Sequence, residues 1–378
     1  MLGGRRLRLL PNKEQEKWLR SNAGVVRFIY NFSLAMKEDA YKEQGLNLGQ
    51  KEIMRQITDM RNTKEYEWLK SYNSETIKQA VKDMLKAYNN FFVRGNKGFP
   101  KFKKKGKCKE SFYVRYDRLY SFDEKHLVIP SLKTKMKISE PCNIIKGSIK
   151  NPRISFDGKY WYLSFSYEIE PLKEDLTDEV IGIDLGIKKL ATCSNWIVYK
   201  NINKSKVIKN LEKRKKMLQK RISRAYEKNK EGKKYVKTNN IIKMEKKVKL
   251  IDRRLSNIRK TYIHTVTAEI VKTKPSCIVI EDLGISNMMK NKHLSRAIQE
   301  QLWYFFRQCL TYKCKFYGDI SLKVASRSYP SSKKCNNCGA VKKFLSLSER
   351  TYHCDCCGFI IDRDLNASLN LRDLAFSL

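Results

Sequence analysis

Histidine is scarce in this chain, which has 378 residues and four histidines: His126, His264, His293 and His353. No two of them form a His-x-His pair, which argues against a transposase that combines histidine-bound metal with a tyrosine. The chain also shows no His-Asn-His nuclease insert. Any cutting chemistry in this protein would therefore come from a carboxylate site.

Long apolar runs are missing too. No stretch approaches the roughly 18 apolar residues that a membrane-spanning helix needs, and residues 1–13 are basic without the apolar core of a signal peptide. We therefore expect no membrane partner and a reducing compartment. In that reducing compartment, eleven cysteines indicate a metal site and scattered buried thiols. Six of them have no metal-site spacing and are expected in the core: Cys108, Cys142, Cys193, Cys277, Cys309 and Cys314.

Acidic residues are few relative to basic ones, with 39 Asp and Glu against 79 Lys and Arg. The net charge of +40 is more than solubility requires and predicts a polyanionic partner, a long nucleic acid first of all. Aromatic residues make up 11% of the chain, which disordered basic tails lack. We therefore expect two or three folded domains with basic surfaces.

The hydrophobic periodicity changes along the chain. After a short strand at 5–10, Asn12 is expected to cap a helix from Lys13, with Glu16 near the capping-box position, and helical spacing continues to about residue 92. Residues 111–170 alternate with period two, which predicts short antiparallel strands and a small barrel. From about 178 onward, strands and helices alternate as in an α/β domain. The expected elements there are a hairpin at 179–195, strands at 277–281 and 322–325, and helices at 294–312 and 366–374.

Three acidic residues stand at the ends of apolar stretches in this second half: Asp184, Glu281 and Asp364. Each alone would be explained by a helix cap or a surface charge. Together they would repel one another, and Mg²⁺ or Mn²⁺ would relieve that repulsion and could support hydrolysis of a phosphodiester by two metal ions. Asp282 and Asp362 adjoin two of them, but neighbouring strand residues face opposite sides, so we expect these two to point away.

Two Cys-x-x-Cys pairs near the end of the chain, with a short segment between them, predict a tetrahedral zinc ribbon. The expected ligands are Cys335, Cys338, Cys354 and Cys357, whereas Cys356 would not bind the metal. A site with four thiolates leaves no position for water, so its role would be structural, holding the segment of Asp364 in place.

Two segments have the composition of nucleic-acid contacts. Residues 201–262 contain 23 Lys and Arg against 5 Asp and Glu, a net charge of +18, and include Arg221, Arg224, Arg253 and Arg254. The alternative is a solvated helical hairpin. The loop at 94–107 interleaves Phe99 and Phe102 with lysines, among them Lys103, Lys104 and Lys105, which suits backbone contacts and base stacking.

With these features in order, the chain resembles the TnpB family of transposon-encoded, RNA-guided nucleases, which are related to type V CRISPR effectors. The resemblance covers nearly the whole chain. It rests on six motifs in the same order: Arg8–Gln15, Arg27–Asn31, Gly182–Gly186, Ile280–Leu283, Ser332–Gly339 and Asp362–Ala367.

The resemblance implies a multidomain α+β fold. A helical recognition domain at 11–93 would be inserted in a small β-barrel wedge domain formed by 1–10 and 94–172. A RuvC-like nuclease domain of the RNase H fold would follow at 178–330 and 359–378, with the Cys₄ zinc ribbon inserted at 331–358.

The implied activity is that of an RNA-guided DNA endonuclease, which binds a guide RNA from the transposon end and cuts target double-stranded DNA beside a short motif. Asp184, Glu281 and Asp364 match the catalytic triad of the family, and no protein partner is indicated. The resemblance also implies a location in the cytoplasm of a prokaryote, at the nucleoid. Similarity also points to contacts of Tyr30, Ser74 and Gln79 with the motif duplex. The alternatives are an RNA-guided repressor unable to cut, which would be expected to lack a triad carboxylate, and a compact type V CRISPR effector.

Overall fold

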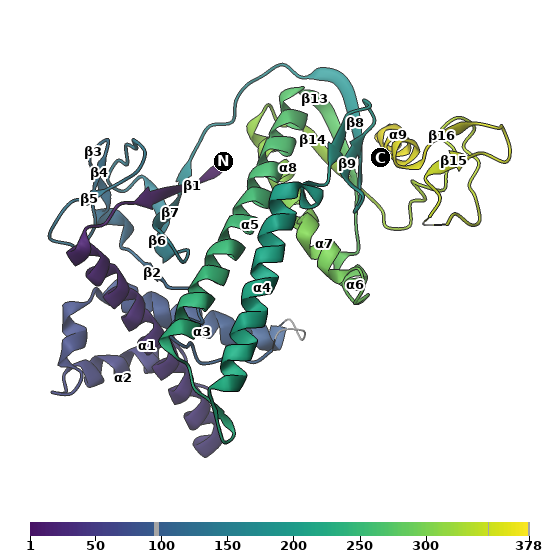
Figure 1. The fold of residues 1–378 in the computed structure, drawn as a ribbon. Helices are drawn as coiled ribbons and strands as arrows, with labels where there is room; N and C mark the ends of the chain where they lie inside the picture. The colour runs from purple at the N-terminus through teal and green to yellow at the C-terminus, as the bar shows by residue number, and fades with distance from the viewer. Residues whose placement is uncertain (94–97, 347, 377–378) are drawn as a thin grey trace. The chain divides into compact units, whose positions relative to one another are not determined.

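The computed structural model of the chain describes residues 1–93, 98–346 and 348–376. Residues 94–97 of the predicted basic loop, residue 347 of the predicted ribbon and residues 377–378 of the predicted nuclease range lie outside the described residues. The chain divides into two compact units, Met1–Ile169 and Glu170–Leu378 (Figure 1). In the described part of the chain, no helix is long and apolar enough to cross a bilayer.

The first unit contains two antiparallel sheets. The larger has the strand order β1-β7-β6-β2, and a bridge from Leu9 to Ile138 connects its β1 edge to the chain beside the smaller sheet, β3-β4-β5. The predicted strand at 5–10 is therefore part of β1 and pairs with β7, the last strand of the unit in sequence. The strands are β1 (Leu2–Leu9), β2 (Ser111–Tyr113), β3 (Tyr120–Asp123), β4 (His126–Val128), β5 (Met136–Lys137), β6 (Ile149–Phe156) and β7 (Trp161–Glu168).

Helices fill the interval between β1 and β2. They are α1 (Lys13–Gln44), α2 (Gln50–Arg61), the 3₁₀ turn η1 (Glu67–Ser71) and α3 (Ser74–Val93), with a second 3₁₀ turn, η2 (Tyr116–Arg118), after β2. As predicted, Asn12 caps α1, but the reciprocal partner in the capping box is Gln15 and not Glu16. The prediction of Glu16 was wrong because the third helical residue, and not the fourth, reaches back to the backbone N–H of the cap.

The helices and sheets of the first unit share a single hydrophobic core. Leu7 and Leu9 of β1, Ile29 of α1 and Ile77 of α3 are all buried in it, together with Trp161 of β7. The helical segment at 11–93 thus packs on the strands that flank it in sequence, as an insertion between β1 and the rest of its sheet would.

The second unit is built on a five-stranded sheet with the order β10-β9-β8-β13-β14. The predicted hairpin at 179–195 is confirmed as β8 and β9, and β13 runs parallel to both β8 and β14. The strands are β8 (Thr177–Leu185), β9 (Lys189–Cys193), β10 (Val198–Lys200), β13 (Pro275–Glu281) and β14 (Ser321–Ala325).

Helices cover both faces of this sheet. Ile183 and Ile280 point to the face covered by α5 (Asn239–Lys272) and α8 (Trp303–Phe316). Val279 and Ala325 point to the opposite face, where they pack on Leu371 of α9 (Arg363–Leu374). Figure 1 shows α9 on the side of the sheet away from α5 and α8. The remaining short elements of the unit are η3 (Ile202–Lys204), α6 (Ile285–Met288), and β15 (Thr351–His353) paired with β16 (Ile360–Asp362).

The single helix predicted at 294–312 is wrong. The chain forms α7 (Ser295–Gln301) and α8, which are separated at Leu302 by a left-handed backbone with φ of 54°. Nothing in the local sequence marks this break, because leucine is a good helix former and the residues on either side keep helical spacing. Burial of Ile298 and Trp303 in the core of the sheet accompanies the change in direction.

The basic segment at 201–262 forms a helical hairpin of α4 (Lys206–Lys228) and α5, closed by the short strands β11 (Lys230–Glu231) and β12 (Lys234–Tyr235). A narrow apolar seam that includes Ile208 and Leu255 joins the two helices. At the base of the hairpin, the Arg259 guanidinium contacts Glu212 at 2.8 Å and Glu300 of α7 at 3.3 Å.

Helix α9 lies directly on the backbone of β8. A Cβ built on Gly182 would come within 2.0 Å of the carbonyl oxygen of Ser368 and 2.4 Å of the backbone nitrogen of Arg372. Only glycine leaves space for this approach, because real Cβ atoms do not come so close to backbone atoms. Residue 182 therefore sets how near α9 lies to the sheet.

We expect Gly182→Ala to destabilise the second unit by about 3 kcal/mol, because the added methyl group forces α9 away from β8. Gly284→Ala is the matched control, since a Cβ there meets no atom within 4 Å. Denaturant unfolding of both variants measures the difference. Equal unfolding free energies for the two variants would show that α9 does not need this close contact.

Candidate functional site

Asp184 and Glu281 lie side by side at the ends of two parallel strands. Ile183 of β8 is in register with Ile280 of β13, and each carboxylate follows its isoleucine directly. Because side chains alternate along a strand, both carboxylates share the face of Gly182 and Val279, which α9 covers. Both are half-buried.

Asp364 reaches the same place from α9. Val180 shares an apolar cluster with Leu374 near the end of α9, whereas Gly182 approaches Ser368 in the middle of the helix. The charge of Asp364, at the start of the helix, acts on Asp184. The helix therefore runs antiparallel to β8. The strand rises about 6 Å from Gly182 to Asp184, and the helix rises about the same distance from Ser368 back to Asp364. The contact between glycine and helix thus brings the first turn of α9 to the carboxylate end of β8.

The electrostatics of the three carboxylates reflect this proximity. Burial raises the pKa of Asp184 well above its usual range, and the charges of Glu281 and Asp364 raise it further. Burial likewise raises the pKa of Glu281 to about 7, against one hydrogen bond from the backbone of Leu185 that lowers it. Half-buried oxygen donors that repel one another fit a divalent cation, which would remove the repulsion.

The two acids that adjoin the triad have other partners. Asp282 accepts hydrogen bonds from Arg307 at 3.2 Å and Arg327 at 2.7 Å. Asp362 caps α9 by accepting from the backbone N–H groups of Asp364 and Leu365. Although partial burial acts to raise the pKa of Asp362, hydrogen bonds from Lys189 and these backbone groups lower it overall.

Sequence reasoning did not identify Lys189 and Arg363, the two cations that lower the pKa of Asp184. The Lys189 Nζ lies 3.1 Å from Asp362 and 3.6 Å from Asp364. A usable signal was present, because Lys189 begins the apolar strand β9 that pairs with the strand of Asp184.

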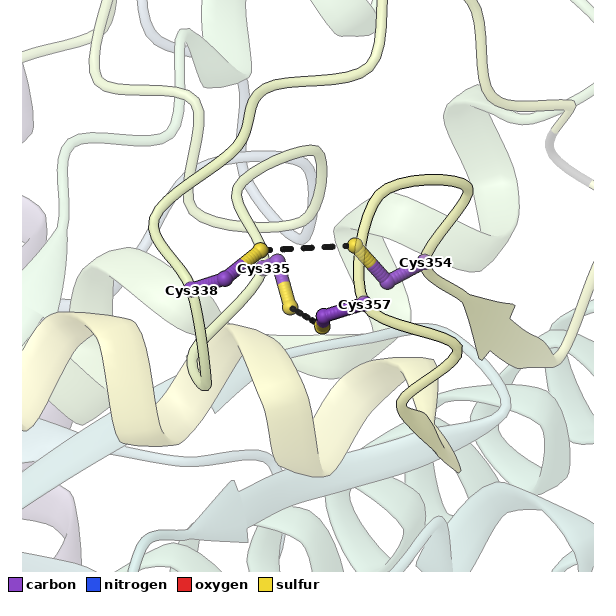
Figure 2. A group of neighbouring side chains, drawn as sticks. All are labelled: Cys335, Cys338, Cys354 and Cys357. Atoms are coloured by element: carbon purple, nitrogen blue, oxygen red, sulfur yellow. Dashed lines mark hydrogen bonds between the residues drawn. The ribbon is translucent and has the colours of Figure 1, made fainter.

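The four predicted cysteine ligands converge on one point (Figure 2). Their Sγ atoms all lie within 4.8 Å of one another, with 3.7 Å between Cys335 and Cys357 and 3.6 Å between Cys338 and Cys354. Four thiolates at 2.3 Å from a tetrahedral zinc ion would be about 3.8 Å apart. The cluster is therefore consistent with structural zinc.

Local backbone and hydrogen bonds support this cluster. Gly339 and Gly358, which follow the two knuckles, have φ of 78° and 69°, a backbone conformation that favours glycine and allows each knuckle to turn tightly. A hydrogen bond from Asn337 lowers the pKa of Cys357 to about 6, which favours the thiolate that a metal binds. Cys356 is exposed and does not belong to the group of four, as predicted.

Within residues 1–93, 98–346 and 348–376, these four cysteines are the one group of three or more His, Cys, Asp or Glu side chains whose ligand atoms gather closely enough to hold a metal ion. The three carboxylates do not form such a group in this structure.

Buried asparagines connect the first knuckle to α9. Asn366 accepts a hydrogen bond from the backbone N–H of Asn336 and donates one to the carbonyl of Lys334 at 2.7 Å. Asn370 donates to the carbonyls of Ser331 and Lys334. Asn366 and Asn370 are 0% and 1% exposed. These two buried side chains therefore bond the helix that carries Asp364 to the first knuckle.

The residues predicted to contact nucleic acid in the first unit differ in exposure. Tyr30 is buried, and the Lys103 Nζ lies 3.5 Å from the centre of its ring. Gln79 donates a hydrogen bond to Asp83, which also holds Arg153 in a two-point ion pair. Ser74, Lys104 and Lys105 are exposed. Ser74, Lys104 and Lys105 are therefore accessible to a ligand without any rearrangement.

In the second unit, Arg221 and Arg224 lie exposed on α4, whereas Arg253 and Arg254 lie on α5, the first half-buried and the second exposed. The acids of the hairpin are largely engaged by its own cations. Asp252 contacts Lys215 at 2.5 Å, and Glu245 contacts Lys237 at 2.5 Å. Most of the excess positive charge therefore faces outward.

Three family profiles match this chain. They are "OrfB_IS605, probable transposase" at residues 164–292, "Cas12f1-like, TNB domain" at 303–371, and "helix-turn-helix domain" at 1–45. The described structure of residues 1–45 is a strand followed by one continuous helix, so the name of the third profile does not describe the fold of this segment.

Known proteins match over most of the chain. "Putative RNA-guided DNA endonuclease InsQ" of Escherichia coli K12 is 30% identical over 97% of this chain and 90% of its own length. "TnpB-like protein L79" of Acanthamoeba polyphaga mimivirus is 27% identical over 66% of this chain and 48% of its own.

A solved structure supports the fold. The protein in the cryo-EM structure of a Cas12f1–sgRNA–target DNA complex aligns with a TM-score of 0.59 and 15% identity, over 96% of this chain and 83% of that one. At this identity the likeness concerns the fold alone. Taken with the match to InsQ across nearly all of both proteins, the profiles show that the chain belongs to the TnpB (OrfB_IS605) family and carries a Cas12f-like TNB domain.

Proposed function

We propose that this protein is an RNA-guided DNA endonuclease that hydrolyses target DNA with divalent metal held by Asp184, Glu281 and Asp364. The observation that carries the proposal is the convergence of these three acids at one end of the sheet. They come from segments that are far apart in the sequence, and the charges of Glu281 and Asp364 raise the pKa of Asp184. Such repulsion costs stability and is retained where it serves a function.

The roles of the residues follow from their positions. Asp184 lies between Glu281 on the neighbouring strand and Asp364 on α9, so it can share a bound metal ion with each of them. When bound there, Mg²⁺ or Mn²⁺ would activate the attacking water and stabilise the leaving 3′ oxygen. The Asp362 cap and the glycine contact hold Asp364 in position. The expected products carry a 5′ phosphate and a 3′ hydroxyl.

The guide RNA and the target DNA would bind to the basic surfaces. On the hairpin of α4 and α5, internal ion pairs engage the acids and leave exposed cations such as Arg221, Arg224 and Arg254 for phosphates. Lys104 and Lys105 offer the same chemistry in the first unit. The relatives named as RNA-guided endonucleases support this assignment of partners.

The alternative of a repressor that cannot cut has no observation in its favour, because all three carboxylates are present and grouped. The choice between a transposon and a CRISPR locus depends on the neighbouring DNA. Co-expression with that flanking DNA, followed by sequencing of the RNA that co-purifies, would supply the guide for the assays below. Recovery of only random cellular RNA would contradict the guided activity.

We expect Asp184→Asn to reduce guided DNA cleavage by at least about 100-fold, since it removes a metal ligand. In zinc-loaded protein with no added Mg²⁺ or Mn²⁺, the same variant should melt at a higher temperature than the wild type, because a neutral amide no longer repels Glu281 and Asp364. Asp282→Asn is the control. It should keep cleavage but lower the melting temperature through loss of its contacts with Arg307 and Arg327. An Asp184→Asn protein that cuts at the wild-type rate would refute the proposed site.

The raised pKa of Glu281 predicts how stability depends on pH without metal. The group keeps its proton up to about pH 7 in the folded protein, against 4.5 for an ordinary glutamate. The folded state therefore binds more protons than the unfolded chain across that interval, and stability falls as the pH rises through it. The melting-temperature advantage of Glu281→Gln over wild type, measured on zinc-loaded protein with no added Mg²⁺ or Mn²⁺, should grow from pH 5 to 7 and then level off. A constant difference would contradict the raised pKa.

We further propose that zinc at the four cysteines holds α9 in place through Asn366 and Asn370. Cys335→Ser should weaken zinc binding by more than about 100-fold and reduce cleavage, since the knuckle that it disrupts is bonded to the helix of Asp364. Cys356→Ser should retain both properties. Zinc content by mass spectrometry of metals and the cleavage rate test the pair. Full cleavage by a zinc-free Cys335→Ser protein would show that the ribbon does not support the site.

A further inference from the structure

Lys189 occupies an unusual position for a lysine, beside the acidic end of the sheet. Its ammonium group donates to both carboxylate oxygens of Asp362, at 3.3 Å and 3.1 Å, and lies 3.6 Å from Asp364 Oδ2. The side chain is only 27% exposed, so these contacts are made partly out of water. A half-buried ion pair of this kind is stronger than one on the surface.

The lysine connects two parts of the site. It begins β9, the strand paired with β8, and it contacts the first turn of α9 through Asp362 and Asp364. The charge of Lys189, like that of Arg363, therefore acts on acids that otherwise repel one another. In the protein without metal, this charge partly neutralises the site.

We propose that Lys189 is a built-in counter-ion that competes with divalent cations for the carboxylates and keeps their metal affinity low. This inference rests on the proposed function, since it concerns the same three acids. Lys189 acts through Asp364 and Asp362 and is therefore a positioning residue. A cation that enters the site must displace the ammonium group from Asp364 or bind beside it, and either case costs binding energy.

The neighbouring lysine provides a matched control. Lys188 is exposed and its backbone carbonyl accepts a hydrogen bond from Lys204, whereas Lys189 points to the acids. Removal of either lysine changes the net charge of the protein by the same amount. A difference between the two variants therefore reports on position and not on total charge.

The test is a titration of the full-length, zinc-loaded protein, free of nucleic acid, with Mn²⁺ followed by electron paramagnetic resonance. Asp364→Asn identifies which bound Mn²⁺ belongs to the site. Lys189→Met should bind that Mn²⁺ about tenfold more tightly than wild type, as expected for the loss of one nearby positive charge. Lys188→Met should change the affinity less than threefold, and Lys189→Arg, which keeps the charge, should resemble wild type.

Mn²⁺ affinity in Lys189→Met that equals or falls below the wild-type value would overturn the inference while leaving the metal site intact. If Asp364→Asn binds Mn²⁺ as the wild type does, both the metal site and this inference are overturned. Lys189→Gln replaces the methionine variant if the latter does not fold, with the same expected tightening. Melting temperatures of the zinc-loaded proteins without Mn²⁺ confirm that each variant is folded.

Discussion

The close contact of β8 with α9 at Gly182 is the constraint on which the second unit depends. Strand pairing alone places Asp184 beside Glu281, but Asp364 belongs to a helix that follows the zinc ribbon in sequence. The helix comes near enough only because residue 182 has no side chain, so that backbone meets backbone. The asparagines that bond the other side of α9 to the first knuckle hold it in this position. A glycine in β8 and the knuckle of the cysteine cluster thus both fix the position of Asp364.

Local patterns were sufficient to predict much of this architecture. Asn12 as a helix cap, the hairpin of β8 and β9, and the cysteine ligands all follow from short-range signals such as capping residues, alternation and spacing. The break at Leu302 could not be predicted, because it arises from packing with distant strands and not from local propensity. Lys189 was missed for a related reason. Its acidic partners lie near the far end of the chain, and only the folded sheet brings them together. The roles of the three acids in catalysis stay predictions.

Charge is distributed unevenly in the second unit, and the two distributions have different consequences. On the hairpin of α4 and α5, the few acids are engaged by neighbouring lysines, and the excess cations face solvent. At the end of the sheet, the acids outnumber the cations close to them, and burial strengthens their repulsion. A polyanion is attracted to the first surface and repelled by the second. The approach of a phosphate backbone to the acids therefore requires that other cations accompany it.

The position of α9 after the zinc ribbon also has a consequence for synthesis of the protein. On the ribosome, Asp184 and Glu281 are made before Asp364, and the sheet can begin to pair while α9 is still inside the exit tunnel. The basic hairpin of α4 and α5 emerges earlier than either the ribbon or α9. The positive charge of the hairpin is thus exposed before Asp364 has been synthesised. The order of the elements delays completion of the acidic cluster until the ribbon and α9 have emerged.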